Sequence, residues 1–96
     1  MGATKLKKQE IATSLAKLEG WSIKNGKLHR AFEFKDFGQA FGFMAQAALA
    51  AEKMDHHPDW SNSWNKVVVD LVTHSAGGLT KNDFDLAAKM QQIAGS

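Results

Sequence analysis

Three of the four histidines stand in two short segments with the composition of an acid–base site. His56 and His57 are adjacent and precede Pro58, and His74 follows a run rich in valine. Histidine titrates near neutral pH, so its ring can both accept and donate a proton there. Loops and strand ends are where a rigid scaffold presents such groups. The two segments therefore predict a site for proton transfer.

Two carboxylates accompany the adjacent histidines. Glu52 and Asp55 lie within about one helical turn of the pair. A carboxylate that accepts a hydrogen bond from one ring nitrogen fixes the tautomer and raises the basicity of the other nitrogen. Pro58 restricts the backbone on both sides and so holds His57 in one direction. The segment has the parts needed to orient an imidazole.

Two other interpretations of these histidines stay open when spacing alone is considered. Adjacent histidines at a helix C-terminus can simply complement the helix dipole or donate to its last carbonyls. A metal site is the second alternative, because His56, His57, His74 and a carboxylate are ligand types for zinc or iron. However, neighbouring residues in extended chain point in opposite directions, and the spacing fits no standard metal motif. We predict no metal.

Hydrophobic periodicity predicts an α+β domain with the order α-β-β-α-β-β-α. Asn25-Gly26 indicates a two-residue hairpin turn, and Asn65-Lys66 is a candidate for a second turn. Thr80 and Asp83 have the spacing of a capping box, as do Asp36 and Gln39. The two hairpins predict a four-stranded antiparallel sheet with helices packed on one face. The expected helices cover residues 8–18, 36–54 and 80–94, and the expected strands cover residues 21–23, 27–34, 59–64 and 66–73.

Composition limits the class of protein. The 96 residues fit a single domain spanning residues 1–96, and a domain this small is commonly stabilised by oligomerisation. The chain has no cysteine, which suits a cytoplasmic location and excludes disulfides. No apolar stretch is long enough for a membrane span, and no secretory signal is expected. The net charge is +2 without a basic stripe, so direct nucleic-acid binding is not expected.

The order and spacing of these residues along the chain resemble the motif of the pterin-4a-carbinolamine dehydratase family. That motif has an acidic residue, three intervening positions, His-His-Pro, an aromatic residue, a histidine and an aspartate. This chain matches it without departure at Glu52, His56-His57-Pro58, Trp64, His74 and Asp83. The phrases FKDFGQAFGFM, AEKMDHHPDW and NKVVVDLVTHSAGGLT are also similar to the family, and the resemblance runs from about residue 21 to residue 94.

The resemblance implies a lyase that removes water from 4a-hydroxytetrahydrobiopterin to give quinonoid dihydropterin, which recycles the pterin after aromatic amino-acid hydroxylation. It implies that His56 and His74 act as the general acid and base and that His57 orients the substrate. No cofactor is expected, because protonation of the leaving oxygen and removal of a ring-nitrogen proton need only positioned histidines. The family fold, a four-stranded antiparallel sheet with helices on one face, agrees with the elements expected from periodicity.

Further roles follow from the same resemblance. Asp55 and Glu52 are expected to orient the imidazoles, and Trp60 or Trp64 to form a wall beside the pterin or to belong to the core. Asp83 is assigned a supporting part, which its capping position alone would explain. The hydroxyl-bearing residues Thr73 and Ser75 are expected to contact the pterin.

Members of the family associate as homodimers or homotetramers, and the Ala-rich helix of this chain suits such assembly. Some relatives stabilise the dimer of a transcription factor, although no sequence feature here indicates that partner. An assembly-factor relative that has lost the chemistry is a further alternative. Such a protein should lack one or more site histidines, and this chain retains all three.

Overall fold

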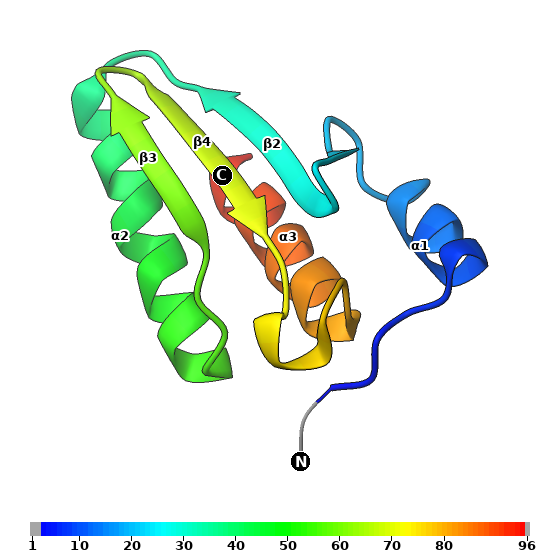
Figure 1. The fold of residues 1–96 in the computed structure, drawn as a ribbon. Coiled ribbons are helices and arrows are strands. Elements are labelled where there is room, and N and C mark those ends of the chain that lie inside the picture. Colours follow the sequence, from blue (N-terminus) through cyan, green and yellow to red (C-terminus); the bar gives the residue numbers. More distant parts are fainter. Residues whose placement is uncertain (1–2, 96) are drawn as a thin grey trace.

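The strands form one antiparallel sheet in the order β1-β2-β4-β3 (Figure 1). The computed structural model describes residues 3–95, and its element order is the predicted α-β-β-α-β-β-α with one added 3₁₀ turn. The predicted fold class is confirmed. The elements are α1 (Lys8–Leu15), β1 (Ser22–Lys24), β2 (Lys27–Glu33), α2 (Phe37–Met54), β3 (Asp59–Ser63), β4 (Lys66–Leu71), η1 (His74–Ala76) and α3 (Lys81–Ala94).

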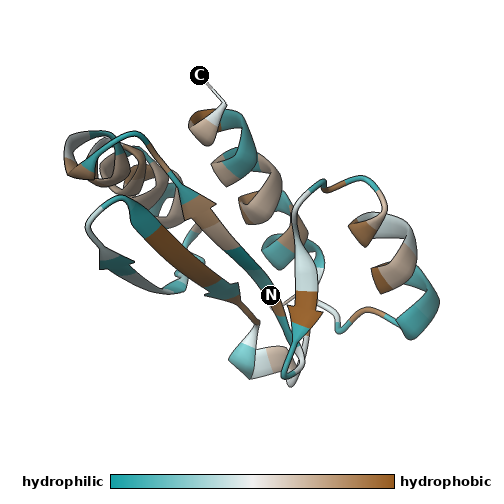
Figure 2. Cartoon of the chain, turned by 90° about the horizontal axis from the view of Figure 1, so that it is seen from above, coloured by the Kyte–Doolittle hydropathy of each residue, from teal (hydrophilic) through white to brown (hydrophobic). Residues whose placement is uncertain are grey.

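Two helices cover one face of the sheet. α2 and α3 lie side by side behind the strands, whereas α1 lies apart from α2 at the β1 side of the molecule (Figure 1, Figure 2). The core between the sheet and the helices contains alternate residues of β2 and β4 and one stripe of each helix. Its fully buried members include Leu28, Val67, Val69, Leu71, Ala40, Ala47, Leu86, Ala87 and Met90.

β4 is the central strand that its continuous apolar sequence predicts. It pairs with β2 and with β3 along nearly its whole length, and it is hydrophobic over most of that length (Figure 2). It ends at Leu71 and not at residue 73, because the chain then turns into η1. Thr73 keeps one isolated bridge to Gly78 across that turn. The end of the best-predicted strand thereby opens toward the segment that holds His74.

The two hairpin turns differ in how well the sequence predicts them. Asn25 and Gly26 have φ of 53° and 76°, the positive values that the predicted type I′ turn requires. The second turn is formed by Trp64 and Asn65, so the prediction of Asn65-Lys66 was wrong by one residue. Asn65 is buried and its side-chain amide donates to the carbonyl oxygen of Phe34 at 2.9 Å. That anchor fixes the register and leaves Trp64 with the positive φ.

Helix ends follow their predicted caps with one exception. The side chains of Asp36 and Thr80 cap α2 and α3 by accepting hydrogen bonds from backbone N–H groups. α1 ends at Leu15, three residues before the predicted end, and the chain continues through turns to Gly20. Among residues 3–95, no helix combines the length and the hydropathy that a bilayer span requires.

Candidate active site

A pocket of about 290 Å³ lies between the α2–β3 connection and the segment that joins β4 to η1. This volume is near the lower end of the range usual for small-molecule sites. The pocket contains all three histidines that the sequence singles out, together with three of their predicted neighbours and one valine. Its lining residues are Asp55, His56, His57, Val72, Thr73, His74 and Ser75.

The end of α2 directs the first two histidines to this pocket. Asp55 adopts a left-handed conformation with φ of 54°, and its N–H group closes the helix on the carbonyl oxygens of Ala51 and Glu52. A residue of this conformation is a common way to end a helix, and Asp tolerates it better than most residues. The chain then reverses, which sends His56 into the protein and leaves His57 half-exposed. Asp55 therefore shapes the pocket as a helix cap.

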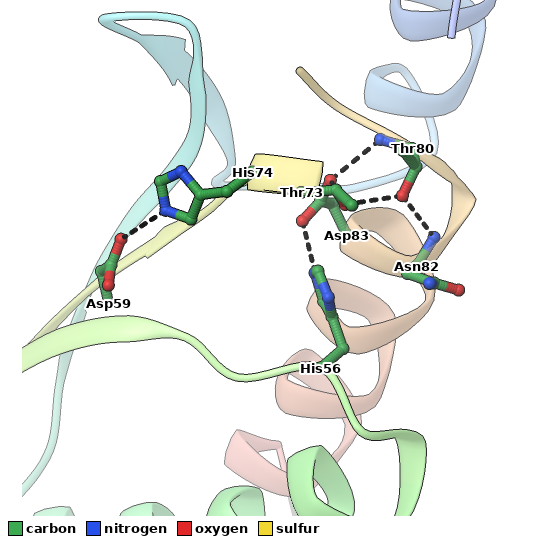
Figure 3. Close-up of polar contacts among 7 residues, drawn as sticks. All are labelled: His56, Asp59, Thr73, His74, Thr80, Asn82 and Asp83. Carbon is green, nitrogen blue, oxygen red and sulfur yellow. Dashed lines mark hydrogen bonds and ion pairs between the residues drawn. The ribbon is translucent and has the colours of Figure 1, made fainter. Parts of the chain in front are cut away.

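His56 is held by a buried carboxylate. Its Nε2 lies 2.6 Å from Oδ1 of Asp83, and Asp83 is completely buried (Figure 3). The other oxygen of Asp83 accepts from the hydroxyl of Thr73 at 2.8 Å and from the backbone N–H of Thr80 at 2.9 Å. An ionised carboxylate can only accept hydrogen bonds, so with Asp83 ionised the hydrogen of this contact lies on Nε2 of His56 and Nδ1 keeps the free lone pair.

Asp83 therefore has two functions at once. It is the third residue of α3 and closes the capping box with Thr80, as the sequence predicts, and it is also the partner of His56. Thr73 and Thr80 share a further hydrogen bond of 2.7 Å, which closes a buried network behind the pocket. Buried polar networks of this kind stabilise a structure only when each member is satisfied. The network joins the start of α3 to the end of β4.

His57 and His74 are much more exposed than His56. Nε2 of His57 lies 2.9 Å from Oε1 of Glu52, and both side chains are largely in solvent. His74 lies on η1 with 79% of its side chain exposed, and its Nε2 is 3.9 Å from Oδ2 of Asp59. In Figure 3, His74 points toward Asp59 and away from the Asp83 network. The pocket thus has one buried imidazole and two at its rim.

Several predicted site residues lie outside the pocket lining. Glu52 reaches the site only through His57, and Asp83 lies behind His56. Trp60 packs partly buried against the hydrophobic core. Trp64 is in the turn at the far end of the β3–β4 hairpin with 67% of its surface exposed. Within one chain, neither tryptophan forms a wall of this pocket.

Sequence reasoning missed Asp59. This residue directly follows Pro58, begins β3 and is the carboxylate nearest to His74. The β3–β4 register, which no local pattern shows, places Asp59 beside Asp70 on the sheet face without helices. Across the described range 3–95, no group of three or more histidine, aspartate or glutamate side chains is arranged to hold a metal ion.

The fold and the pocket define a small α+β protein in which three histidines line one pocket. Residues 4–93 match the family described as Pterin 4 alpha carbinolamine dehydratase. The chain belongs to this family.

Relatives and a solved structure agree with that assignment. A Solibacter usitatus protein with the provisional name pterin-4-alpha-carbinolamine dehydratase is 53% identical, and the match covers 95% of this chain and 96% of that protein. A Brucella ovis protein with the same provisional name is 50% identical over 99% of this chain and all of its own length. The crystal structure of a transcriptional coactivator/pterin dehydratase from Brucella melitensis matches with a TM-score of 0.91 at 50% identity, covering 95% of this chain and 99% of that one.

A more distant structure shares the fold alone. It is a pterin dehydratase-like protein identified as a RuBisCO assembly factor in the alpha-carboxysome, with a TM-score of 0.65 and 23% identity. The match covers 79% of this chain and 88% of that one.

Proposed function

We propose that this protein is a hydro-lyase that dehydrates 4a-hydroxytetrahydrobiopterin to quinonoid dihydropterin. The observation that supports the proposal is the pocket itself, in which His56, His57 and His74 converge and each ring has a carboxylate within 4 Å. The reaction removes one proton from a ring nitrogen and one hydroxyl group from the 4a-carbon. It therefore needs a base, an acid and a means of holding the ring.

His56 is suited to accept the proton from the pterin ring nitrogen. Its Nε2 donates to Asp83, so Nδ1 is the basic nitrogen, and the anionic carboxylate stabilises the imidazolium that forms. Burial of this pair excludes water and strengthens the interaction. Asp83 does not touch the substrate and acts by holding His56.

His74 and His57 complete the proposed reaction from the rim of the pocket. Hydroxide is a poor leaving group, so a protonated His74 would donate to the departing oxygen and release water. His57, fixed by Glu52, would orient the ring. Thr73 and Ser75 flank His74 in the pocket lining, where their backbone or hydroxyl groups are placed to contact the pterin.

The test is the rate of decay of synthetic 4a-hydroxytetrahydrobiopterin with and without protein. We expect the protein to accelerate decay, and His56→Ala or His74→Ala to lower kcat by about 100-fold or more. His57→Ala should mainly raise KM. His29→Ala is the matched control, because His29 pairs with Asp70 at 2.9 Å outside the pocket. Folded protein that decays the substrate no faster than buffer would overturn the proposal.

We further propose that the active form is a homo-oligomer built through α2. From Phe37 to Ala51 this helix carries no charged residue, and Phe37, Phe41 and Leu49 expose 52%, 59% and 73% of their surface. An exposed apolar stripe of this kind marks an interaction surface. The Brucella melitensis homologue is described as a transcriptional coactivator as well as a dehydratase, so a protein partner is the alternative occupant.

Charge distribution along α2 favours a second copy as that occupant. Lys35 and Asp36 precede the helix, and Glu52 and Lys53 lie in its last turn. In an antiparallel pair of α2 helices related by two-fold symmetry, the start of one helix faces the end of the other. The lysine and the acidic residue at each end then lie near residues of opposite charge in the second copy. The apolar stripe then meets an identical stripe without burying a charge.

A further inference from the structure

We infer that Asp59 is the positioning residue of His74, as Asp83 is for His56; the inference rests on the proposed dehydration. Each of the other three histidines has a carboxylate oxygen within 3 Å of one ring nitrogen. His74 lies on a three-residue 3₁₀ turn, with most of its ring in solvent. Without a fixed partner, such a side chain would sample several rotamers.

The geometry brings Asp59 to His74 from a rigid element. Asp59 is the first residue of β3 and pairs with Asp70 of β4, so its backbone is held by the sheet. Its Oδ2 lies 3.9 Å from Nε2 of His74, the ion pair drawn in Figure 3. This separation is longer than a hydrogen bond, and catalytic contacts in unliganded sites often tighten only when substrate binds.

The negative charge of Asp59, on the sheet face without helices, attracts the protonated ring of His74. Asp59 stands opposite Asp70 in the β3–β4 register, and each carboxylate has its own basic partners. His29 pairs with Asp70, whereas Lys27 approaches Asp59 at 3.5 Å. Nζ of Lys27 and Nε2 of His74 approach the same oxygen of Asp59, Oδ2.

The consequence for the reaction concerns which nitrogen of His74 faces the substrate. In the protonated ring both nitrogens are donors. If Nε2–H is turned toward Asp59, Nδ1–H is the donor left for the departing 4a-oxygen. Asp59 does not touch the substrate in this arrangement and acts through the orientation of His74.

Kinetics of Asp59→Asn test the inference. Because exposed ion pairs are weak, we expect a loss in kcat of about fivefold, with KM unchanged. Asp59→Glu should restore most of the loss. Asp70→Asn is the matched control, since it removes the neighbouring carboxylate on the same face, which pairs with His29, and it should leave both constants unchanged. Equal kinetics for Asp59→Asn and Asp70→Asn would overturn the inference.

A double-mutant cycle separates positioning from a general structural effect. If Asp59 acts through His74, adding Asp59→Asn to His74→Ala should lower kcat no further. A further loss of the same size in that background would show that Asp59 acts on something else.

A spectroscopic readout keeps this result separate from the proposed function. In Asp59→Asn, the ring ¹⁵N signals of His74 should move while those of His29 stay, and Asp70→Asn should do the reverse. Unchanged His74 signals would overturn the inference whatever the activity. If the wild-type protein had no dehydratase activity and the variants still showed these signal changes, the proposed function would be overturned. Only the contact between Asp59 and His74 would then stand.

Discussion

At the residue scale, Asp83 joins the stability of α3 to the orientation of His56. The same carboxylate accepts from the backbone N–H of Thr80 and from Nε2 of His56. These two contacts make different demands on the side chain. The cap needs only an acceptor oxygen, which an amide also has, whereas the tautomer of His56 needs a partner that accepts and carries negative charge.

Asp83→Asn separates the two demands. The amide oxygen can still cap α3, but an N–H group that faces His56 would favour the wrong tautomer. We expect kcat for the dehydration to fall on the order of 100-fold or more, by analogy with the loss when an orienting aspartate becomes asparagine in a catalytic triad. Steady-state kinetics and thermal unfolding would be measured together.

Asp36→Asn is the matched control for that substitution. Asp36 is the N-cap residue of α2 and accepts from the N–H of Gln39 at 2.8 Å, and it lies at the end of this 18-residue helix that is remote from the pocket. We expect its kinetics to equal those of the wild type. If Asp83→Asn also kept full activity, Asp83 would be a helix cap and no more.

The residue scale is where prediction from sequence was most uneven. The three histidines that line the pocket could be singled out because their types and order match the family motif. The sequence indicated Asp83 as a helix cap and as a position of the family motif. Spacing alone could not show that it contacts His56, which lies 27 residues earlier. Asp59 could not be found without the strand register that brings it to His74. Such contacts depend on tertiary geometry that no local pattern records.

At the element scale, backbone constraints decided which turns were predictable. The Asn25-Gly26 turn needs two positive φ values, and both residue types favour them, so the local signal was sufficient. The second turn was misplaced because a long-range hydrogen bond from Asn65 to Phe34 overrides the local preference. Strand and helix types were predictable because alternation and 3.6-residue periodicity report burial directly.

Two glycine substitutions test this account of the elements. Gly26→Ala should destabilise the fold by about 1 kcal/mol, because alanine disfavours a φ of 76°. Steric clash does not contribute, since an added methyl group would meet no neighbour. Gly42→Ala is the control within α2, where an added methyl group also meets no neighbour. This substitution should stabilise the fold by about 0.5–1 kcal/mol, because alanine favours the helix over glycine. Urea unfolding midpoints would measure both. A stabilising Gly26→Ala would contradict the turn assignment.

At the scale of the whole molecule, the chain is compact but leaves apolar surface uncovered. Its radius of gyration of 12.9 Å is close to the roughly 12–13 Å expected for a folded domain of this length. The shape therefore does not require a partner. A partner is expected instead from the α2 stripe, because a contiguous exposed apolar patch often marks an interaction surface.

Self-association through α2 can be tested by adding one charge to that stripe. In the proposed two-fold pair, Phe41→Glu would bury one carboxylate from each copy in the apolar stripe, and that burial opposes assembly. We expect sedimentation velocity to show a homo-oligomer for the wild type and a monomer for Phe41→Glu. Ile23→Glu is the matched control, since Ile23 is a 42% exposed apolar residue on β1, and it should keep the oligomer. A wild-type monomer at micromolar concentration would exclude this assembly and leave the stripe to a different protein partner.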